Sequence, residues 1–76
     1  MNLLGTTNAG HTIIQYKETA KDEGIVLAYK LFNTYVNKIQ FVTWLVVLHD
    51  GKPDYYWGHY FFDNLRVALE DFEKRD

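Results

Sequence analysis

The chain has 76 residues, no cysteine and a formal net charge of −2, which indicates one small domain over residues 1–76 and excludes disulfides and thiolate metal ligands. Its charged residues are dispersed, so the basic patch typical of duplex nucleic-acid binders is missing. The N-terminus has no basic region followed by an apolar segment, and no apolar run approaches the roughly 18 to 20 residues that cross a bilayer. We therefore expect a cytoplasmic protein without a membrane partner.

The N-terminal segment predicts turns followed by a first strand. Glycine and asparagine interrupt any helix over residues 1–10, and Leu3 and Leu4 either dock on a sheet edge or belong to a frayed terminus. Residues 12–18 alternate between apolar and polar side chains, as a strand does, and their polar content favours an edge of the sheet.

A second strand is expected over residues 25–32, after a polar turn that ends at Gly24. A helix is the alternative for this segment, because leucine, alanine and lysine favour helices. The glycine before the segment and the polar pair after it bound a strand-length run, which favours the strand. Residues 33–38, with two asparagines, are expected to connect it to the next element.

Residues 40–49 carry the clearest strand signal. β-Branched and aromatic residues fill the segment without glycine or proline, and both faces of the alternating pattern are mostly apolar, which predicts a central strand covered on both sides. Asp50 and Gly51 then mark a hairpin, but Pro53 lacks an amide donor and is expected in the connection or at a strand's first residue. We therefore predict a loop of about four to six residues.

The returning strand, residues 55–62, is dominated by aromatic side chains. Strict alternation places one set on the first face, namely Tyr55, Trp57, His59 and Phe61, and another on the second face, namely Tyr56, Gly58, Tyr60 and Phe62. Gly58 interrupts the middle of this strand, and a glycine there often marks a bulge or the close approach of another element.

From Asp63 onward, the apolar period changes to that of a helix. Apolar residues recur at the spacing of one helical stripe, namely Leu65, Ala68, Leu69 and Phe72. Asp63 is the expected N-cap, because its carboxylate can accept hydrogen bonds from the first free amides. The stripe predicts a helix of about twelve residues, with Glu70–Lys74 and Asp71–Arg75 as favourable pairs along it.

The whole pattern predicts an α+β fold: a four-stranded antiparallel meander sheet with one C-terminal helix packed on one face. One short helix can cover only part of such a sheet. The predicted uncovered face offers large side chains as an interaction surface, namely Trp44, Tyr55, Trp57, His59 and Phe61. The alternative is that the N-terminal segment and the curl of the strands bury these rings within the chain.

These features favour a non-enzymatic interaction protein that forms a homodimer, or binds another protein, through the aromatic face or an edge strand. The alternative is a binder of single-stranded nucleic acid or of a small ligand on the same face, because a row of aromatic side chains is typical of a stacking platform for bases. Nucleic acid is the less favoured partner, since such platforms lie in a basic groove and only Lys30, Lys38 and Lys52 are near. In its length, acidity and lack of cysteine the chain resembles the small accessory proteins of bacteria and their mobile elements, a likeness of style that assigns no residue a role.

A metal or catalytic site is the least favoured interpretation. His49 and His59 lie on the two arms of the hairpin with Asp54 in its loop, and two imidazoles with a carboxylate can bind a metal or act in acid–base chemistry. Their spacing matches no motif, serine and cysteine nucleophiles are absent from the sequence, and residues near a hairpin end are usually solvated. We expect no cofactor and no enzymatic activity.

Overall fold

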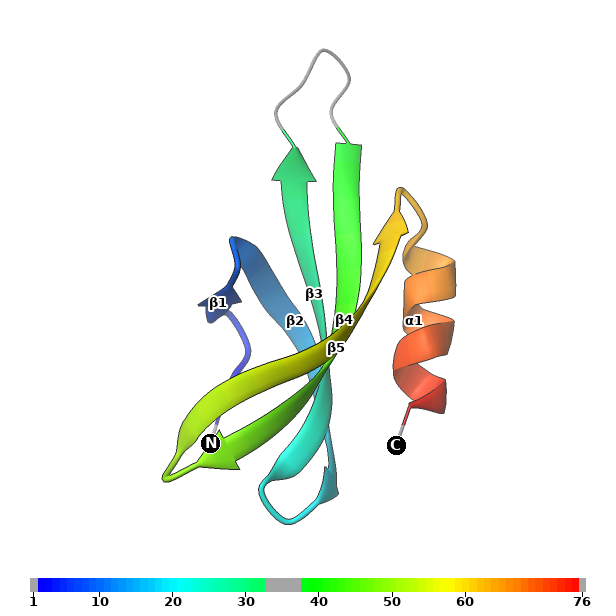
Figure 1. The fold of residues 1–76 in the computed structure, drawn as a ribbon. Coiled ribbons are helices and arrows are strands. Elements are labelled where there is room, and N and C mark those ends of the chain that lie inside the picture. The colour runs from blue at the N-terminus through cyan, green and yellow to red at the C-terminus, as the bar shows by residue number, and fades with distance from the viewer. Residues whose placement is uncertain (1, 33–37, 76) are drawn as a thin grey trace.

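A computed structural model describes residues 2–32 and 38–75, which form one antiparallel meander sheet and one C-terminal helix (Figure 1). The strands follow one another across the sheet in chain order, and neighbouring strands are antiparallel. The elements are β1 (Thr7–Asn8), β2 (His11–Ala20), β3 (Glu23–Phe32), β4 (Lys38–His49), β5 (Lys52–Phe62) and α1 (Leu65–Lys74). The predicted α+β fold is confirmed.

The four predicted strands are present, and a two-residue strand, β1, precedes them. It is joined to β2 by Ala9 and Gly10, whose positive φ angles of 49° and 77° make a tight turn. The predicted connection over residues 33–38 lies outside the described residues except for Lys38, which begins β4. In the part of the chain that the structure describes, no helix is long and apolar enough to cross a membrane.

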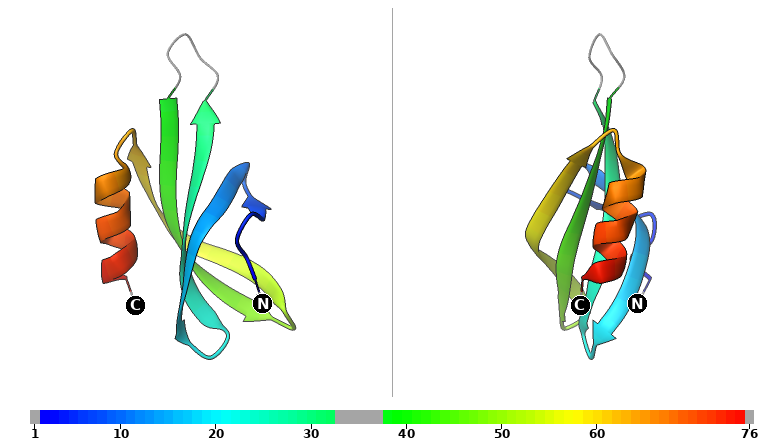
Figure 2. Two further views of the ribbon diagram at one scale, coloured as in Figure 1. Left: turned by 180° about the vertical axis from the view of Figure 1, so that it is seen from behind. Right: turned by 90° about the vertical axis from the view of Figure 1, so that its right-hand side faces the viewer.

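The sheet is strongly curled, so that its strands form about half of a barrel (Figure 2). Irregular pairing contributes to the curl, because a bulge bends a strand and increases its twist. The pairing of β2 with β3 shifts twice, first between Ile13 and Gln15, and the pairing of β4 with β5 shifts once. His11 on β2 and Tyr60 on β5 consequently meet across one face of the sheet, with ring centroids 6.4 Å apart.

Each face of the sheet carries an apolar cluster. On the helix face, the buried Ala68 and Phe72 of α1 pack on Ile25, Leu27 and Phe41. On the opposite face, called here the Trp44 face, the buried cluster consists of Leu3, Ile13, Val26, Ala28, Val42, Trp44 and Val46. Both faces of β4 are therefore covered over residues 41–44, as its apolar pattern predicts, whereas Leu45 and Val47 beyond the end of α1 are half-buried.

Leu3 closes the Trp44 face from the N-terminal segment. Its side chain is 2% exposed within that cluster, whereas the next residue, Leu4, is 51% exposed. The segment is held to the sheet by a hydrogen bond from the Gly5 amide to the Ile13 carbonyl. The expectation of an open face bearing Trp44 is therefore wrong, because the N-terminal segment and the curl of the strands bury this ring within the chain.

The β4–β5 hairpin turns in two residues. His49 pairs with Lys52, and Asp50–Gly51 between them have positive φ angles of 52° and 79°, as in a type I′ turn. The predicted loop of four to six residues is therefore wrong, because Pro53 does not end the ladder. Pro53 lies on β5, the edge strand, and pairs with Leu48 of β4. A missing amide donor is tolerated on an edge strand.

The helix is capped one residue later than predicted. Asn64 is the N-cap, since its side-chain oxygen accepts a hydrogen bond from the Val67 amide. Asp63, the predicted cap, instead exchanges hydrogen bonds with Ile39: its amide donates to the Ile39 carbonyl, and its carboxylate accepts from the Ile39 amide. Asp63 thus ends the β4–β5 ladder, and its φ of 51° turns the chain toward α1.

The charged residues of α1 and its C-cap, Arg75, make contacts beyond the predicted pairs. Glu70 lies 3.5 Å from Arg66, one turn earlier on the exposed side of the helix. Asp71 and Arg75 both hydrogen-bond to Thr43 on β4. These two residues therefore attach the helix to the sheet.

Candidate functional site

A bulge in β5 sets the geometry of the candidate site. The pairing of β4 with β5 shifts by one residue, so that Trp57 and Gly58 together lie opposite Trp44. Trp57 has a φ of 54°, a left-handed conformation that is rare for bulky residues. Gly58 has no room for a side chain, because a Cβ there would lie 2.7 Å from Trp44 Nε1 and 2.9 Å from the Tyr60 ring. The irregularity that the sequence indicates at Gly58 is confirmed.

The bulge reverses the alternation of faces along β5. Tyr55 packs in the cluster of the Trp44 face, whereas Phe61 packs in the cluster of the helix face. The prediction that Tyr55, Trp57, His59 and Phe61 share one face is therefore wrong, because it assumed strict alternation through the bulge. The stacking platform for bases that depended on this shared face is not assembled.

Trp44 and Tyr55 lie inside the Trp44 face. Trp44 is 5% exposed, and its ring centroid lies 5.5 Å from that of Tyr55 and 5.4 Å from that of His11. Burial raises the pKa of the Tyr55 hydroxyl, whose oxygen is buried without a hydrogen-bond partner among the described residues. These two residues of the predicted interaction surface therefore belong to the packing of this chain.

His11 is a buried polar residue that the sequence pattern does not single out. Its Nδ1 lies 3.0 Å from the Ala9 carbonyl oxygen, and its Nε2 lies 3.0 Å from the side-chain oxygen of Gln40. A neutral ring that donates from Nδ1 satisfies the first contact, and the Gln40 amide can turn its NH₂ group toward Nε2. Both ring nitrogens are thus used within the fold.

His59 and Phe61 face α1. Phe61 is half-buried against the helix-face cluster, and His59 Nδ1 lies 2.9 Å from the Asp71 carboxylate. The same carboxylate accepts a hydrogen bond from the Thr43 hydroxyl, while Arg75 donates to the Thr43 carbonyl and hydroxyl. This network joins β4 and β5 to the C-terminal half of α1.

Asp71 carries the negative charge of this network. Partial burial acts to raise the pKa of its carboxyl group, but the hydrogen bonds from Thr43 and His59 and the positive charges of His59 and Arg75 outweigh burial and lower that pKa below its usual 3.8. Asp71 is therefore ionised at neutral pH, and its charge strengthens the attachment of the helix.

The histidines proposed for a metal site do not come together. His49 lies at the hairpin end, with its Nε2 3.4 Å from the Asp54 carboxylate, whereas His59 is paired opposite Thr43. Residues 43 and 49 of one strand are about 20 Å apart. Among the described residues, no cluster of three or more metal-ligating side chains is present.

Exposed aromatic side chains gather on β5, namely Tyr56, Trp57, Tyr60 and Phe62, at 43%, 73%, 55% and 59% exposure. Trp57 belongs to the predicted interaction surface, whereas the other three belong to the set that strict alternation places on the second face. The bulge divides these four residues between two surfaces.

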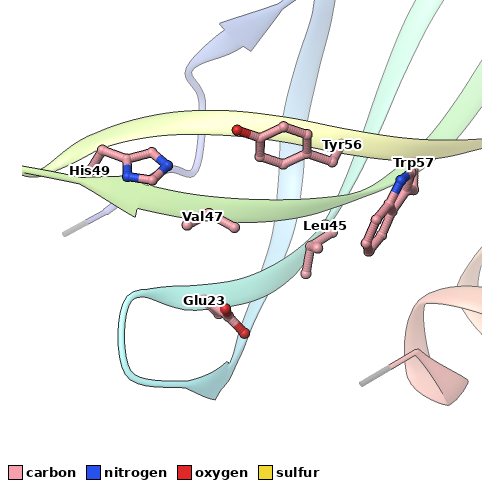
Figure 3. Close-up of a pocket in the computed structure, with 6 residues that line it drawn as sticks. All are labelled: Glu23, Leu45, Val47, His49, Tyr56 and Trp57. Carbon is pink, nitrogen blue, oxygen red and sulfur yellow. The ribbon is translucent and has the colours of Figure 1, made fainter.

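The first surface is a groove on the helix face, beyond the C-terminal end of α1. It encloses about 400 Å³ and is lined by Glu23, Leu45, Val47, His49, Tyr56 and Trp57 (Figure 3). The lining residues come from β3, β4 and β5, with Trp57 at one end and His49 at the other. We call it the Trp57 groove.

The second surface lies on the Trp44 face and consists of Phe32, Tyr60 and Phe62; we call it the Phe62 patch. The rings of Phe32 and Phe62 are 6.0 Å apart, and the Tyr60 ring lies 6.4 Å from the Trp44 ring. The patch itself is uncharged. Lys30 borders it, with its Nζ 5.2 Å from the centre of the Phe32 ring.

Comparison of the chain with protein-family models, with curated proteins and with solved structures gives no match. A functional proposal therefore rests on the two surfaces of β5 themselves.

Proposed function

We propose that this chain is a non-enzymatic interaction protein that self-associates by placing the Phe62 patches of two copies against each other. The observation that supports the proposal is the exposure of Tyr60 and Phe62, at 55% and 59%, beside a Trp44 that is 5% exposed. Aromatic side chains that remain exposed next to a closed core are typical of protein interfaces.

The Phe62 patch suits a contact between two identical copies. A two-fold interface places the same surface of each copy against itself, so it favours side chains that do not repel their own kind. The rings of Phe32, Tyr60 and Phe62 meet this condition, and the charges of Lys30 and Lys38 lie at the border of the patch, outside the rings. The Trp57 groove does not, because Glu23 lies in it and Asp54 borders it, and these carboxylates would face their own copies.

Contact through side chains is favoured over strand addition at the free edge of β5. Pro53 removes an amide donor from this strand, and the bulge at Trp57–Gly58 interrupts its regular ladder. Lys52 adds a charge at the start of the strand. Proline, bulges and lysine are the features by which sheets discourage edge-to-edge pairing.

The size of the patch limits the strength of the dimer. Three aromatic side chains bury at most roughly 150–250 Å² each, which is less than the roughly 800 Å² per partner of a stable interface. We therefore expect the dimer to dissociate in the micromolar concentration range.

The solution mass of the purified chain across a hundredfold range of micromolar concentrations tests the proposal. The mass should rise from monomer toward dimer, and the thermal midpoint of unfolding should rise with it. The double variant Tyr60→Ala with Phe62→Ala should stay monomeric throughout the range. Trp57→Gly, which lies outside the patch, should behave like the unmodified chain. A constant monomer mass, or a dimer lost only in Trp57→Gly, would contradict the proposal.

A further inference from the structure

The floor of the Trp57 groove continues the sheet surface that α1 covers. Arg75, the C-cap of the helix, donates to the Thr43 carbonyl, so α1 ends at the level of Thr43. Leu45 and Val47 are the next residues of β4 on the helix face, and both are half-buried. The end of the helix therefore leaves an apolar strip of β4 open in the groove (Figure 3).

Carboxylates flank this strip on both sides. Val47 is paired with Glu23 on β3 and with Asp54 on β5, and directly opposite residues of antiparallel strands have Cβ atoms about 5 Å apart. Glu23 is exposed, and the Asp54 side chain is 57% exposed, with His49 Nε2 at 3.4 Å from it. The groove is therefore apolar along its centre, with the Glu23 carboxylate in its lining on one side and the Asp54 carboxylate, in contact with His49, at its border on the other.

Trp57 closes one end of the groove in a strained backbone conformation that the packing of its own side chain does not offset. Its φ of 54° is disfavoured for a bulky residue, and its side chain is 73% exposed, so packing within the described chain contributes little in return. Backbone strain of this kind concentrates at ligand-binding sites. The indole at this position is therefore best explained by a contact with another molecule.

We propose that the Trp57 groove receives an arginine side chain from a different protein. The methylene stem would lie on Leu45 and Val47, the guanidinium would stack on the Trp57 indole, and its N–H groups would donate to Glu23 and Asp54. A planar guanidinium stacks on aromatic rings and pairs with carboxylates through parallel hydrogen bonds. This combination fits arginine better than lysine, whose ammonium is a compact point charge.

The charge of the groove favours a basic partner over a second copy of this chain. The chain has a formal net charge of −2, and a two-fold contact through the groove would bring Glu23 and Asp54 of both copies together. Like charges placed across an interface weaken association, whereas complementary charges strengthen it. The inference is independent of self-association, because the Phe62 patch lies on the other face of the sheet.

The test uses blocked arginine, N-acetyl-arginine methylamide, as the probe, with blocked citrulline as a control of similar shape without the charge. In nitrogen-15 NMR spectra, the indole N–H signal of Trp57 is identified as the one that Trp57→Gly removes. Arginine should shift this signal saturably, and citrulline should bind about tenfold more weakly. Glu23→Gln and Asp54→Asn should each weaken arginine binding about threefold or more, whereas Phe62→Ala should leave it unchanged.

Trp57→Gly is expected to fold with a thermal midpoint at least equal to that of the unmodified chain, because glycine adopts a positive φ without strain. The folded variant should no longer bind arginine, as judged by the amide signals of Leu45 and Val47. Three results would overturn the proposal: citrulline binding as well as arginine, unchanged arginine binding in both carboxylate variants, or a Trp57 signal that moves with protein concentration alone. The last result would place a second copy in the groove.

Discussion

Gly58 lies so close to the Trp44 indole that no side chain fits at this position. A Cβ would meet Trp44 Nε1 at 2.7 Å and the Tyr60 ring at 2.9 Å. Trp44 is itself in contact with the rings of His11 and Tyr55, so it cannot move aside without disturbing the cluster around it. The bulge, and with it the outward position of Trp57, therefore depends on glycine at residue 58.

Gly58→Ala should lower the free energy of unfolding by about 2 kcal/mol, because overpacking a filled site costs roughly 1–3 kcal/mol. Chemical denaturation followed by circular dichroism measures this change. Gly5→Ala is the matched control, since nothing lies within 4 Å of its added Cβ and only its positive φ opposes the substitution, at about 1 kcal/mol. Equal losses in the two variants would show that Trp44 does not restrict residue 58.

The irregularity at residue 58 can be predicted from the sequence, but its effect on the surface cannot. A glycine inside an aromatic strand marks a bulge locally, whereas the residue that bulges is decided by pairing with Trp44 on another strand. A shift of one residue moves every later side chain to the other face. Strict alternation therefore groups Tyr55 with Phe61, and Tyr56 with Tyr60, although the members of each pair lie on opposite faces of the folded sheet.

Among the elements, α1 illustrates which contacts a local pattern predicts. Its apolar stripe predicts the buried face at Ala68 and Phe72, which follow the helical period, whereas Leu65 in the first turn is 44% exposed. Its polar contacts could not be predicted in this way. Lys17 of β2 donates to the Glu73 carbonyl, and the Asp71 carboxylate contacts the Thr43 hydroxyl of β4 and the His59 imidazole of β5. These groups come together only when the sheet is assembled.

Asp71→Asn should lower the free energy of unfolding by about 1 kcal/mol at neutral pH. This value lies near the lower end of the range for hydrogen bonds to a charged group, because the Asp71 carboxylate is partly solvated. The pKa of Asp71 is lower in the folded chain than its usual 3.8. Its ionised form therefore stabilises the fold above that value, and the contribution is lost as the pH falls through the folded pKa.

Denaturation of the unmodified chain and of Asp71→Asn across a pH series measures this dependence. The difference between them should shrink as the pH falls from about 5 to about 2, where the Asp71 carboxylate becomes protonated. Glu70→Gln is the control, because the exposed pair of Glu70 with Arg66 contributes less than about 0.5 kcal/mol at any pH. A difference for Asp71→Asn that does not change with pH would show that its charge has no role in the attachment.

For the whole molecule, the two faces of the sheet are closed by different segments. α1 covers the helix face as far as Thr43, while Leu3 and the curl of the strands close the Trp44 face. The fold class could be predicted because strand and helix periods are local properties. The curl could not, since it depends on register shifts between strands. Of the aromatic residues predicted for the open surface, Trp57 is exposed, whereas Trp44, Tyr55 and Phe61 pack within the chain.

The division of the β5 aromatic residues between two faces is the claim on which both proposed surfaces depend. Nuclear Overhauser contacts of the Trp44 indole in the folded chain test it most directly. We expect contacts from Trp44 to both Tyr55 and Tyr60, whose ring centroids lie 5.5 and 6.4 Å from its own. A strictly alternating β5 would put these two tyrosines on opposite faces, so contacts to only one of them would contradict the bulge and the surfaces that follow from it.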